Sequence, residues 1–299
     1  MSQPSPQVPA AVEPDYPTAR LTTVGTGGPA RWFARPTSVA ELGDVLVWAA
    51  EAGHEIAVIG LGSNLLVADE GYDGVVIRLA GELARIERDG ERIVCGGGAS
   101  LAAIVKRATG WGLSGIEFGC AIPGTAGGAV RMNAGAYGGE IRDELADALV
   151  IGAAGQRRGG PDELGMSYRR STIAAGEVVA EAVLELRPGD PAQIRETVSE
   201  MQRRRREAQP AKVRTFGSVW KNPGGDSTAG RLLEECGLKG FAVGGARISP
   251  VHANFIENHD GARSADVIAL MREARRRARE RGVELEHEVQ MLGPIGLDV

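Results

Sequence analysis

Apolar residues recur at helical spacing in some segments of the chain and in short runs of strand length in others. Ser38 and Glu41 form a capping box that opens one predicted helix, and Gly53 would end it. The inward stripe of this helix consists of Leu42, Val45, Leu46 and Ala49. Strands are predicted at residues 31–34, 56–59, 74–79, 92–95, 148–151 and 178–186. Helices that alternate with strands and glycine loops indicate an α+β or α/β enzyme domain.

Four further helices complete the pattern. Ser100 caps one that ends near residues 110–112, and the others span residues 193–207, 226–237 and 264–282, with Ser264 capping the last. The helix at 193–207 follows a plausible domain boundary at residues 188–191 and ends in a run of four arginines. Such a run is most often a solvated face, although one arginine could still reach an anion.

The C-terminal residues 283–292 have the alternation of a strand. Glu284, Glu286 and Glu288 would share one face of it. One of these glutamates is a candidate for a buried, useful carboxylate, but the spacing alone does not say which.

Residues 96–139 hold thirteen of the 43 glycines in the chain. Glycine inside an ordinary element costs roughly 0.5–1 kcal/mol relative to alanine, so this density suggests backbone with positive φ or backbone close to a ligand. The steps Pro123-Gly124 and Gly127-Gly128 suit loops whose N–H groups can bind phosphate. A set of ordinary tight turns is the alternative.

The segment Gly60-Leu61-Gly62 is not a dinucleotide-binding fingerprint, because the third glycine is missing and no helical pattern follows. A strand, a glycine turn and two small polar side chains, Ser63 and Asn64, remain. These side chains can hydrogen-bond phosphate or a heterocycle, and turn chemistry alone explains them equally well.

Composition narrows the class of protein. A chain of 299 residues with 43% hydrophobic content can bury a proper core, and a net charge of −5 makes broad nucleic-acid binding unexpected. The three cysteines lie far apart, which argues against disulfides and a zinc site. No apolar run is long enough for a membrane span. Five prolines in the first seventeen residues predict a disordered tail over 1–19. We therefore expect a soluble cytoplasmic protein.

Six motifs in order resemble the UDP-N-acetylenolpyruvoylglucosamine reductase (MurB) family of bacterial cell-wall synthesis, over residues 22–293. They are GSNLLV (62–67), IPGTAGGAVRMNAGAYGGE (122–140), YRRS (168–171), GSVWKNP (217–223), AGRLLEECGLKG (229–240) and LEHEV (285–289). The chain departs from the family at Val24-Gly25, where a bulky and often basic residue is usual, and at His287, which replaces a common proline.

The resemblance implies a two-lobed FAD-binding domain of the vanillyl-alcohol-oxidase (PCMH) type at 20–190, with lobes at about 20–80 and 81–190. A smaller α+β substrate-binding domain would follow at 191–299, with a C-terminal catalytic strand. NADPH would reduce the flavin, which would then reduce UDP-N-acetyl-enolpyruvoylglucosamine to UDP-N-acetylmuramate. A monomer without membrane insertion or nucleic-acid partners is expected.

Three catalytic residues follow from the motif matches. Ser218 would donate a proton to the enolate that forms when hydride adds to the vinyl carbon. Arg169 would brace the substrate carboxylate, with Arg170 as the neighbouring alternative. Glu288 would be the C-terminal catalytic acid. Without the resemblance, each of these residues has a simpler interpretation as a loop serine, a surface arginine or an exposed glutamate.

The remaining site residues are also implied by the resemblance. The flavin would contact Gly60, Gly62, Ser63, Asn64, Pro123, Gly124, Thr125 and Gly128, mostly through backbone N–H groups. Arg214 is either a further flavin contact or plain surface. The substrate would contact Tyr168, Arg205, Lys221 and Asn222, with Arg205 near the UDP phosphates.

Two other functions compete with the reductase. One is another FAD oxidoreductase on the same scaffold, although such enzymes often tether flavin through His or Cys and the glycine-rich stretch has no His. The other is a non-catalytic nucleotide-sugar binding protein, which would be colourless. An RNA-binding role for the basic helix is the weakest alternative, because glutamates surround its arginines.

Overall fold

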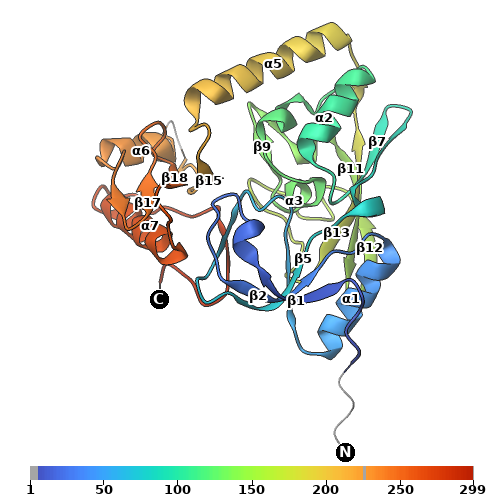
Figure 1. The fold of residues 1–299 in the computed structure, drawn as a ribbon. Coiled ribbons are helices and arrows are strands. Elements are labelled where there is room, and N and C mark those ends of the chain that lie inside the picture. The colour runs from blue at the N-terminus through green and yellow to red at the C-terminus, as the bar shows by residue number, and fades with distance from the viewer. Residues whose placement is uncertain (1–5, 225–226, 299) are drawn as a thin grey trace, which may run out of the picture. The chain divides into compact units, whose positions relative to one another are not determined.

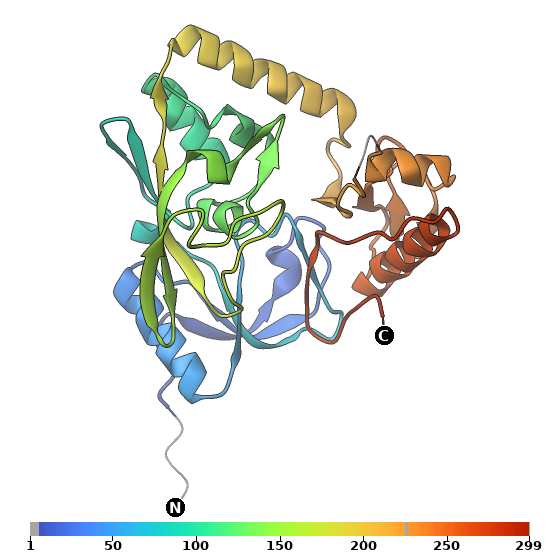
Figure 2. The same ribbon diagram turned by 180° about the vertical axis from the view of Figure 1, so that it is seen from behind.

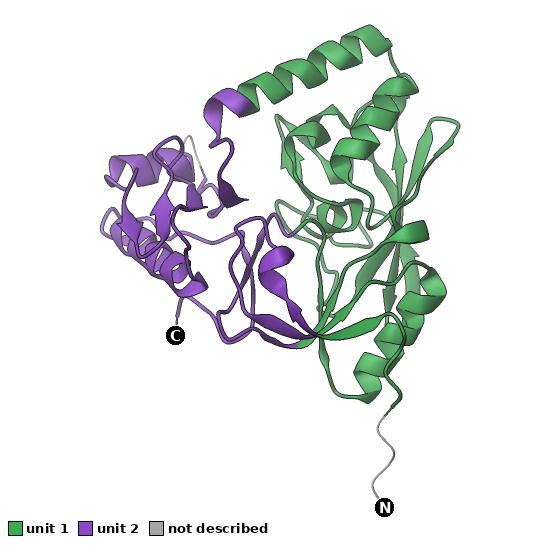
Figure 3. Cartoon of the chain, in the orientation of Figure 1, with its two compact units in different colours: residues 1–14, 32–61, 74–205 green, residues 15–31, 62–73, 206–299 purple. Residues whose placement is uncertain are grey.

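The computed structural model describes residues 6–224 and 227–298, which form two compact units (Figures 1 and 3). The first unit takes the described residues of 1–14, 32–61 and 74–205, and the second takes those of 15–31, 62–73 and 206–299. Both units mix helices and strands, so the fold is α+β. Each unit is assembled from separate chain segments, whereas the sequence predicts contiguous domains at 20–190 and 191–299. Those functional limits stay a prediction.

The main sheet of the first unit has the strand order β12-β11-β13-β7-β6, and all neighbours in it are antiparallel. Its strands are β6 (Ile86–Asp89), β7 (Arg92–Gly96), β11 (Leu145–Gly152), β12 (Gly155–Gly159) and β13 (Val178–Glu185). The helices nearby in sequence are α2 (Leu101–Gly110), α3 (Ala126–Arg131) and α4 (Ile141–Glu144). Ser100 accepts a hydrogen bond from the N–H of Ala103, so the predicted cap of α2 is confirmed.

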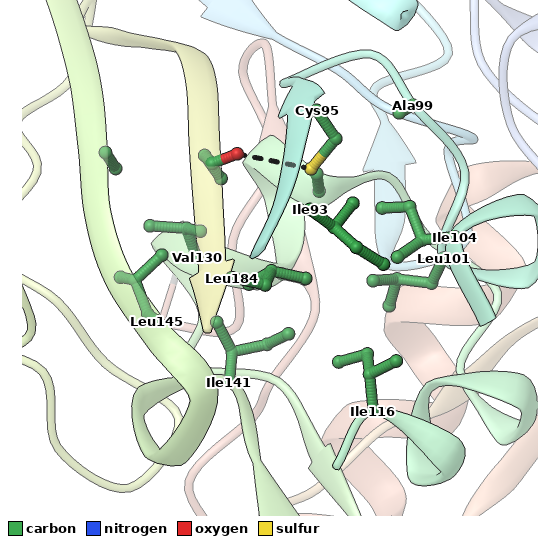
Figure 4. Close-up of a cluster of buried hydrophobic side chains, with 14 of the residues drawn as sticks. Ile93, Cys95, Ala99, Leu101, Ile104, Ile116, Val130, Ile141, Leu145 and Leu184 are labelled. Atoms are coloured by element: carbon green, nitrogen blue, oxygen red, sulfur yellow. Dashed lines mark hydrogen bonds between the residues drawn. The ribbon is translucent and has the colours of Figure 1, made fainter. Parts of the chain in front are cut away.

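Apolar side chains of this sheet and of α2 form one buried core (Figure 4). Ile93 and Leu184 are cross-strand partners on β7 and β13, and Ile104 of α2 belongs to the same cluster. Cys95 is fully buried there and donates a weak hydrogen bond to the carbonyl of Ala182, at 3.5 Å. Burial raises the pKa of the Cys95 thiol to about 12, so this cysteine is an inert core residue.

Helix α1 (Val39–Glu51) forms where the apolar stripe predicts it. Ser38 accepts a hydrogen bond from the N–H of Glu41, and the predicted stripe is buried. The stripe faces a core shared with β3 (Glu55–Val58) and β5 (Tyr72–Ile77), which pair in parallel. A sheet of order β1-β2-β5-β3 contains these strands with β1 (Val12–Pro17) and β2 (Pro29–Ala34).

Short elements connect these parts. Two-residue ladders join β8 (Leu113–Ser114) to β14 (Arg187–Pro188) and β9 (Gly135–Ala136) to β10 (Gly139–Glu140). The 3-10 turns are η1 (Thr18–Arg20), η2 (Gly81–Ala84) and η3 (Glu117–Ala121). The long helix α5 (Pro191–Ala208) buries Ile194.

Among the described residues, no helix has both the length and the apolar surface that crossing a membrane requires.

The second unit is built on an antiparallel sheet of order β15-β18-β17-β16. Its elements are β15 (Arg214–Ser218), α6 (Ala229–Glu235), β16 (Ala242–Val243), β17 (Ala246–Ile248), β18 (Phe255–Asn258) and α7 (Ser264–Arg279). Phe216, Ile256 and Met271 share its core. The strand β19 (Gln290–Leu292) pairs in parallel with β4 (Leu65–Val67). Figure 2 shows the last segment of the chain looping away from α7 and returning toward it.

Three predictions from the sequence need correction. The tail is not disordered over residues 12–20, where β1 and η1 form; residues 1–5 lie outside the described chain. Ser264 is the first residue of α7 and not its cap, because its hydroxyl bonds to Thr26 and to the carbonyl of Val67. The predicted strand at 283–292 is regular only in β19, because an isolated bridge to Trp220 replaces the ladder at His287.

Two other predictions concern α6 and the arginine helices. Helix α6 begins at Ala229 after its cap Thr228, later than predicted, and Asp226 lies outside the described residues. The outer face of α7 is salt-bridged, because Arg276 and Arg277 both pair with Glu273. In α5, Arg203 and Arg204 pair with Glu200 on the solvent side, whereas Arg205 is partly buried.

Candidate active site

A cavity of about 260 Å³ lies in the first unit, beside the glycine turn that follows β3 and at the start of α3. Its backbone walls include Gly60, Leu61, Gly97, Gly98, Thr125, Gly127 and Gly128. Its charged lining consists of Arg35, Arg78, Arg131 and Glu177. A concave site with exposed backbone and a few charged groups is the usual form of a nucleotide-binding site.

The glycines of this cavity have different causes. A Cβ on Gly60 would lie 2.6 Å from the Thr125 hydroxyl oxygen, and one on Gly127 would lie 3.0 Å from the carbonyl oxygen of Gly97. Close packing therefore requires glycine at both positions. Gly128 has an ordinary φ, and its Cβ would meet nothing closer than 3.7 Å. The protein fold does not demand glycine at 128, so its absent side chain keeps the cavity wall open to a ligand.

The cavity lining carries three guanidinium groups and one carboxylate. The carboxylate, on Glu177, already accepts hydrogen bonds from Arg157 and from the N–H of Ala174. Arg131 donates to the carbonyl of Ala174 at 3.0 Å, and burial lowers its pKa from the ordinary value. Excess positive charge in a partly dehydrated pocket favours an anionic ligand such as a phosphate.

Arg169 lies at the tip of a tight turn in the first unit. Backbone hydrogen bonds join Ser167 and Arg170 in both directions, and Arg169 between them has φ +55°. A non-glycine residue in the left-handed region costs on the order of 1–3 kcal/mol and persists only when the surroundings hold it. The Arg169 guanidinium donates to the carbonyl of Gly135 at 2.7 Å and lies 4.9 Å from the Tyr168 ring centroid.

The side chain of Asn133 hydrogen-bonds to this turn. Asn133 is fully buried, has φ +41° and donates from Nδ2 to the carbonyl of Ser167 at 3.0 Å. Its Oδ1 accepts from the N–H of Arg142, and Nδ2 also contacts the Glu140 carboxylate. The buried Asn133 amide therefore connects its own segment with the turn that carries Arg169 and with residues 140–142. Arg170 is exposed, whereas Arg169 is partly buried, so Arg169 is the better held of the two candidate arginines.

Val219, the residue after Ser218, contacts Glu288 through backbone in the second unit. Ser218 is the last residue of β15 and is partly buried. The next residue, Val219, accepts a hydrogen bond from the N–H of Glu288 at 2.8 Å. The carbonyl of Glu288 in turn accepts from Asn64 Nδ2 at 2.9 Å. This arrangement, the Ser218–Glu288–Asn64 junction, joins three segments that are far apart in the sequence.

The three C-terminal glutamates are now distinguished. Glu284 pairs with Arg279 and Arg275, and Glu286 is 73% exposed and pairs with Lys221. Glu288 is partly buried and is the glutamate within the junction. The neighbouring residue Asn222 accepts from the N–H of Ala229 at 3.1 Å, at the start of α6.

Comparison with known proteins gives a consistent result. The pattern of the UDP-N-acetylenolpyruvoylglucosamine reductase C-terminal domain matches residues 209–292, and that of an FAD binding domain matches residues 30–158. UDP-N-acetylenolpyruvoylglucosamine reductase 2 of Symbiobacterium thermophilum is 43% identical over 288 residues, 95% of this chain and 93% of that protein. The chain belongs to the UDP-N-acetylenolpyruvoylglucosamine reductase family.

Other relatives agree with this family assignment. The reductase of Anaeromyxobacter sp. is 45% identical over 280 residues, which cover 93% of this chain and 88% of that protein. The crystal structure of the reductase (MurB) from Thermus caldophilus has a TM-score of 0.84 at 38% identity and covers 94% of this chain and 99% of its own. The resemblance drawn from the six motifs is confirmed, as are the FAD-binding α+β fold and the class of flavin-dependent oxidoreductase.

The predicted flavin residues of this family member fall in both units. Gly60, Thr125 and Gly128 line the cavity of the first unit, and Pro123 and Gly124 precede them in the same loop. The others, Gly62, Ser63, Asn64 and Arg214, belong to the second unit. Gly62 has φ +66°, and a Cβ there would lie 1.8 Å from the carbonyl oxygen of Leu21. Turn geometry alone therefore explains Gly62.

The departure from the reductase family at Val24-Gly25 has a structural counterpart. Val24 is buried in the core of the second unit, and Gly25 has φ +73°. A Cβ on Gly25 would lie 2.8 Å from Arg214 Nη1, so the missing side chain makes room for the Arg214 guanidinium. A basic group thus remains beside this position, although it comes from another part of the sequence.

Sequence reasoning on this reductase did not select Arg35, Arg78 and Arg131 as cavity residues. An arginine in a mostly apolar or glycine-rich segment has no neighbouring sequence pattern that marks it as a cavity residue. Gly97 and Gly98 lay inside the glycine-rich stretch but were not singled out. Arg205 is predicted to lie near the substrate phosphates. In the structure it lies near Cys120. Burial raises the pKa of the Cys120 thiol, and the positive charge of Arg205 partly opposes that rise.

Proposed function

We propose that this chain is the NADPH-dependent flavin reductase that converts UDP-N-acetyl-enolpyruvoylglucosamine to UDP-N-acetylmuramate, a step of peptidoglycan precursor synthesis. The observation that carries the proposal is the Ser218–Glu288–Asn64 junction in a chain that matches reductases of this name along nearly its whole length. As further parts of the proposal, the enzyme acts as a monomer in the cytoplasm and uses neither nucleic acid nor a membrane as a partner.

The cavity of the first unit fits part of FAD. Gly60, Thr125 and Gly128 leave backbone exposed at its wall, and Gly128 keeps open a space that the fold itself does not need. The arginine-rich lining suits the pyrophosphate charge, while a volume of about 260 Å³ holds only a portion of a dinucleotide. FAD, when bound, would supply the hydride that it receives from NADPH.

The protein's own groups handle charge and protons. Once hydride has added to the vinyl carbon of the substrate, negative charge builds on the carbon that bears the carboxylate. Ser218, the last residue of β15 and the neighbour of Val219 in the junction, donates a proton to that carbon. Arg169 bears a permanent positive charge suited to the substrate carboxylate, and Glu288 acts as the second acid. Tyr168, Arg205, Lys221 and Asn222 bind the nucleotide sugar.

A two-stage anaerobic absorbance experiment tests this function. The purified protein should be yellow and should lose its visible flavin absorbance when NADPH is added. Its colour should return when UDP-N-acetyl-enolpyruvoylglucosamine follows, with UDP-N-acetylmuramate as product. If NADPH bleaches the flavin and the enolpyruvyl nucleotide does not restore the colour, whereas the oxidation product of a sugar or alcohol does, the result would favour another FAD oxidoreductase. A protein that remains colourless after incubation with FAD would favour a nucleotide-sugar binding protein.

A further inference from the structure

Both backbone polar groups of Glu288 are bound by other segments of the second unit. Its N–H donates to the carbonyl of Val219 at 2.8 Å, in the segment that begins with Ser218. Its carbonyl accepts from the side chain of Asn64 at 2.9 Å. The first bond sets the position of Glu288 against the segment of the proposed proton donor, and the second sets it against the turn at Gly62.

The backbone around Asn64 continues this contact. The carbonyl of Asn64 accepts from the N–H of Gln290 at 3.0 Å, and Leu65 is then the parallel-strand partner of Gln290. Asn64 is therefore the residue at which the β4–β19 pairing begins, and its side chain extends that pairing by one bond to Glu288. A backbone ladder alone would end at Gln290, two residues short of the acid.

The side chain of Asn64 thus makes a long-range hydrogen bond to the protein backbone, and turn geometry alone does not explain the choice of asparagine. An amide has two N–H donors on one nitrogen, and here that nitrogen lies within hydrogen-bond distance of a main-chain carbonyl. Serine or threonine would be too short to replace it, and aspartate would present oxygen to oxygen. The residue type is explained by the need for a donor of this length.

We propose that Asn64 is a positioning residue of the reductase reaction: its side-chain amide holds Glu288 in register with Ser218 and with the turn at Gly62. This inference rests on the proposed function and deepens it, since it gives Asn64 a role in proton transfer to the enolate rather than in binding the flavin. A shift of about 1 Å in a reacting group can lower a rate on the order of 100-fold. Loss of the amide therefore slows the substrate half-reaction and leaves the flavin half-reaction unchanged.

The test compares Asn64→Ala and Asn64→Asp with the wild-type holoenzyme. FAD affinity is measured by quenching of flavin fluorescence, and each half-reaction is followed anaerobically by stopped-flow absorbance. Both variants are expected to change FAD affinity and the rate of reduction by NADPH less than about threefold. Both should slow reoxidation by the enolpyruvyl nucleotide by about 10–100-fold. Asn64→Asp keeps the shape of the side chain, so its impairment isolates the missing donor.

A double-variant cycle identifies the group through which Asn64 acts. In a Glu288→Gln background, Asn64→Ala should slow reoxidation by less than about threefold further, because the positioned acid is already gone. The alkaline limb of the pH profile for reoxidation, where a general acid loses its proton, should shift in Asn64→Ala and vanish in Glu288→Gln. Additive effects in the cycle, or a tenfold loss of FAD affinity, would overturn the inference and make Asn64 a flavin ligand.

Asn258 provides a matched control. Its Nδ2 donates to the carbonyl of Val24 at 2.9 Å, which is also a long-range amide–carbonyl bond in the second unit. Asn258→Ala should leave reoxidation within about threefold of wild type. Equal slowing in both alanine variants would show general loosening of the unit and would overturn the inference. If the wild-type enzyme itself fails to reoxidise with this nucleotide, the proposed function fails first, and that result is distinct from unimpaired Asn64 variants.

Discussion

The cavity of the first unit and the junction of the second use opposite means to build a site. The cavity is shaped by absent side chains, because Gly60 and Gly127 let the chain pack closely and Gly128 leaves space open at its wall. The junction is shaped by contacts, because hydrogen bonds hold both the N–H and the carbonyl of Glu288. The difference separates two tasks: a large ligand needs open surface, whereas proton transfer needs a group held in one place.

The largest effect is expected at the junction, from Ser218→Ala. Loss of a general acid costs typically about 10²–10⁴-fold in rate, so reoxidation by the enolpyruvyl nucleotide should fall by that factor. Reduction by NADPH and FAD affinity should stay close to wild type, because the hydroxyl takes no part in either. Anaerobic stopped-flow absorbance measures both half-reactions. Wild-type rates in both would remove Ser218 from the mechanism.

Arg169→Ala should come next. Removal of one preorganised charge at a developing anion costs about 10²–10³-fold, again in the substrate half-reaction. The bound flavin should remain, which the ratio of flavin to protein absorbance reports. Loss of colour in this variant would instead give Arg169 a structural role beside Asn133 and Gly135.

At the cavity, Gly60→Ala should change binding rather than chemistry. Its Cβ would lie 2.6 Å from the Thr125 hydroxyl oxygen, and overpacking of this kind costs about 1–3 kcal/mol. FAD affinity should fall by roughly tenfold, as measured by flavin fluorescence. Once saturated with FAD, the variant should reoxidise at the wild-type rate.

Gly43→Ala is the matched control for that variant. Gly43 lies within α1, and a Cβ there would meet nothing within 4 Å. Alanine should leave FAD affinity unchanged and raise the free energy of unfolding by about 0.5–1 kcal/mol, because it favours the helix. Weaker FAD binding in Gly43→Ala would mean that the Gly60 effect is not local.

The smallest effect is expected from Arg131→Gln in the cavity lining. Arg131 is one of three arginines there, so its loss should weaken FAD binding by only about three- to tenfold. The weakening should shrink as salt is raised, because salt screens the attraction to the pyrophosphate that Arg131 adds in the wild type. Titrations of FAD at two ionic strengths measure this. Unchanged affinity at low salt would place the flavin phosphates elsewhere.

Local signals predicted the regular elements well. The Ser38 and Ser100 caps are confirmed, and the apolar stripe of α1 is buried as expected. Such features depend on residues three or four positions apart, which a single sequence displays directly. The proline-rich start misled because strand β1 forms through pairing with β2, a partner that the local composition of the tail does not reveal.

The candidate site was accessible from sequence only through motif resemblance. Nothing near Asn64 indicates that its amide contacts residue 288, because the partner is 224 positions away. The same limit applies to Glu286, whose partner Lys221 is 65 positions away. The roles assigned to Arg169, Ser218 and Glu288 stay predictions until the half-reactions are measured.

The parallel pairing of β4 with β19 also has a consequence for biosynthesis. The ribosome synthesises β4 early, but β4 cannot form its parallel pairing with β19 until residues 290–292 have been translated. Glu288 therefore reaches its place among the final events of folding, whereas local helices such as α1 can form long before. Premature termination just before Gln290 would yield a polypeptide that contains every proposed catalytic side chain and lacks the strand that secures the last of them.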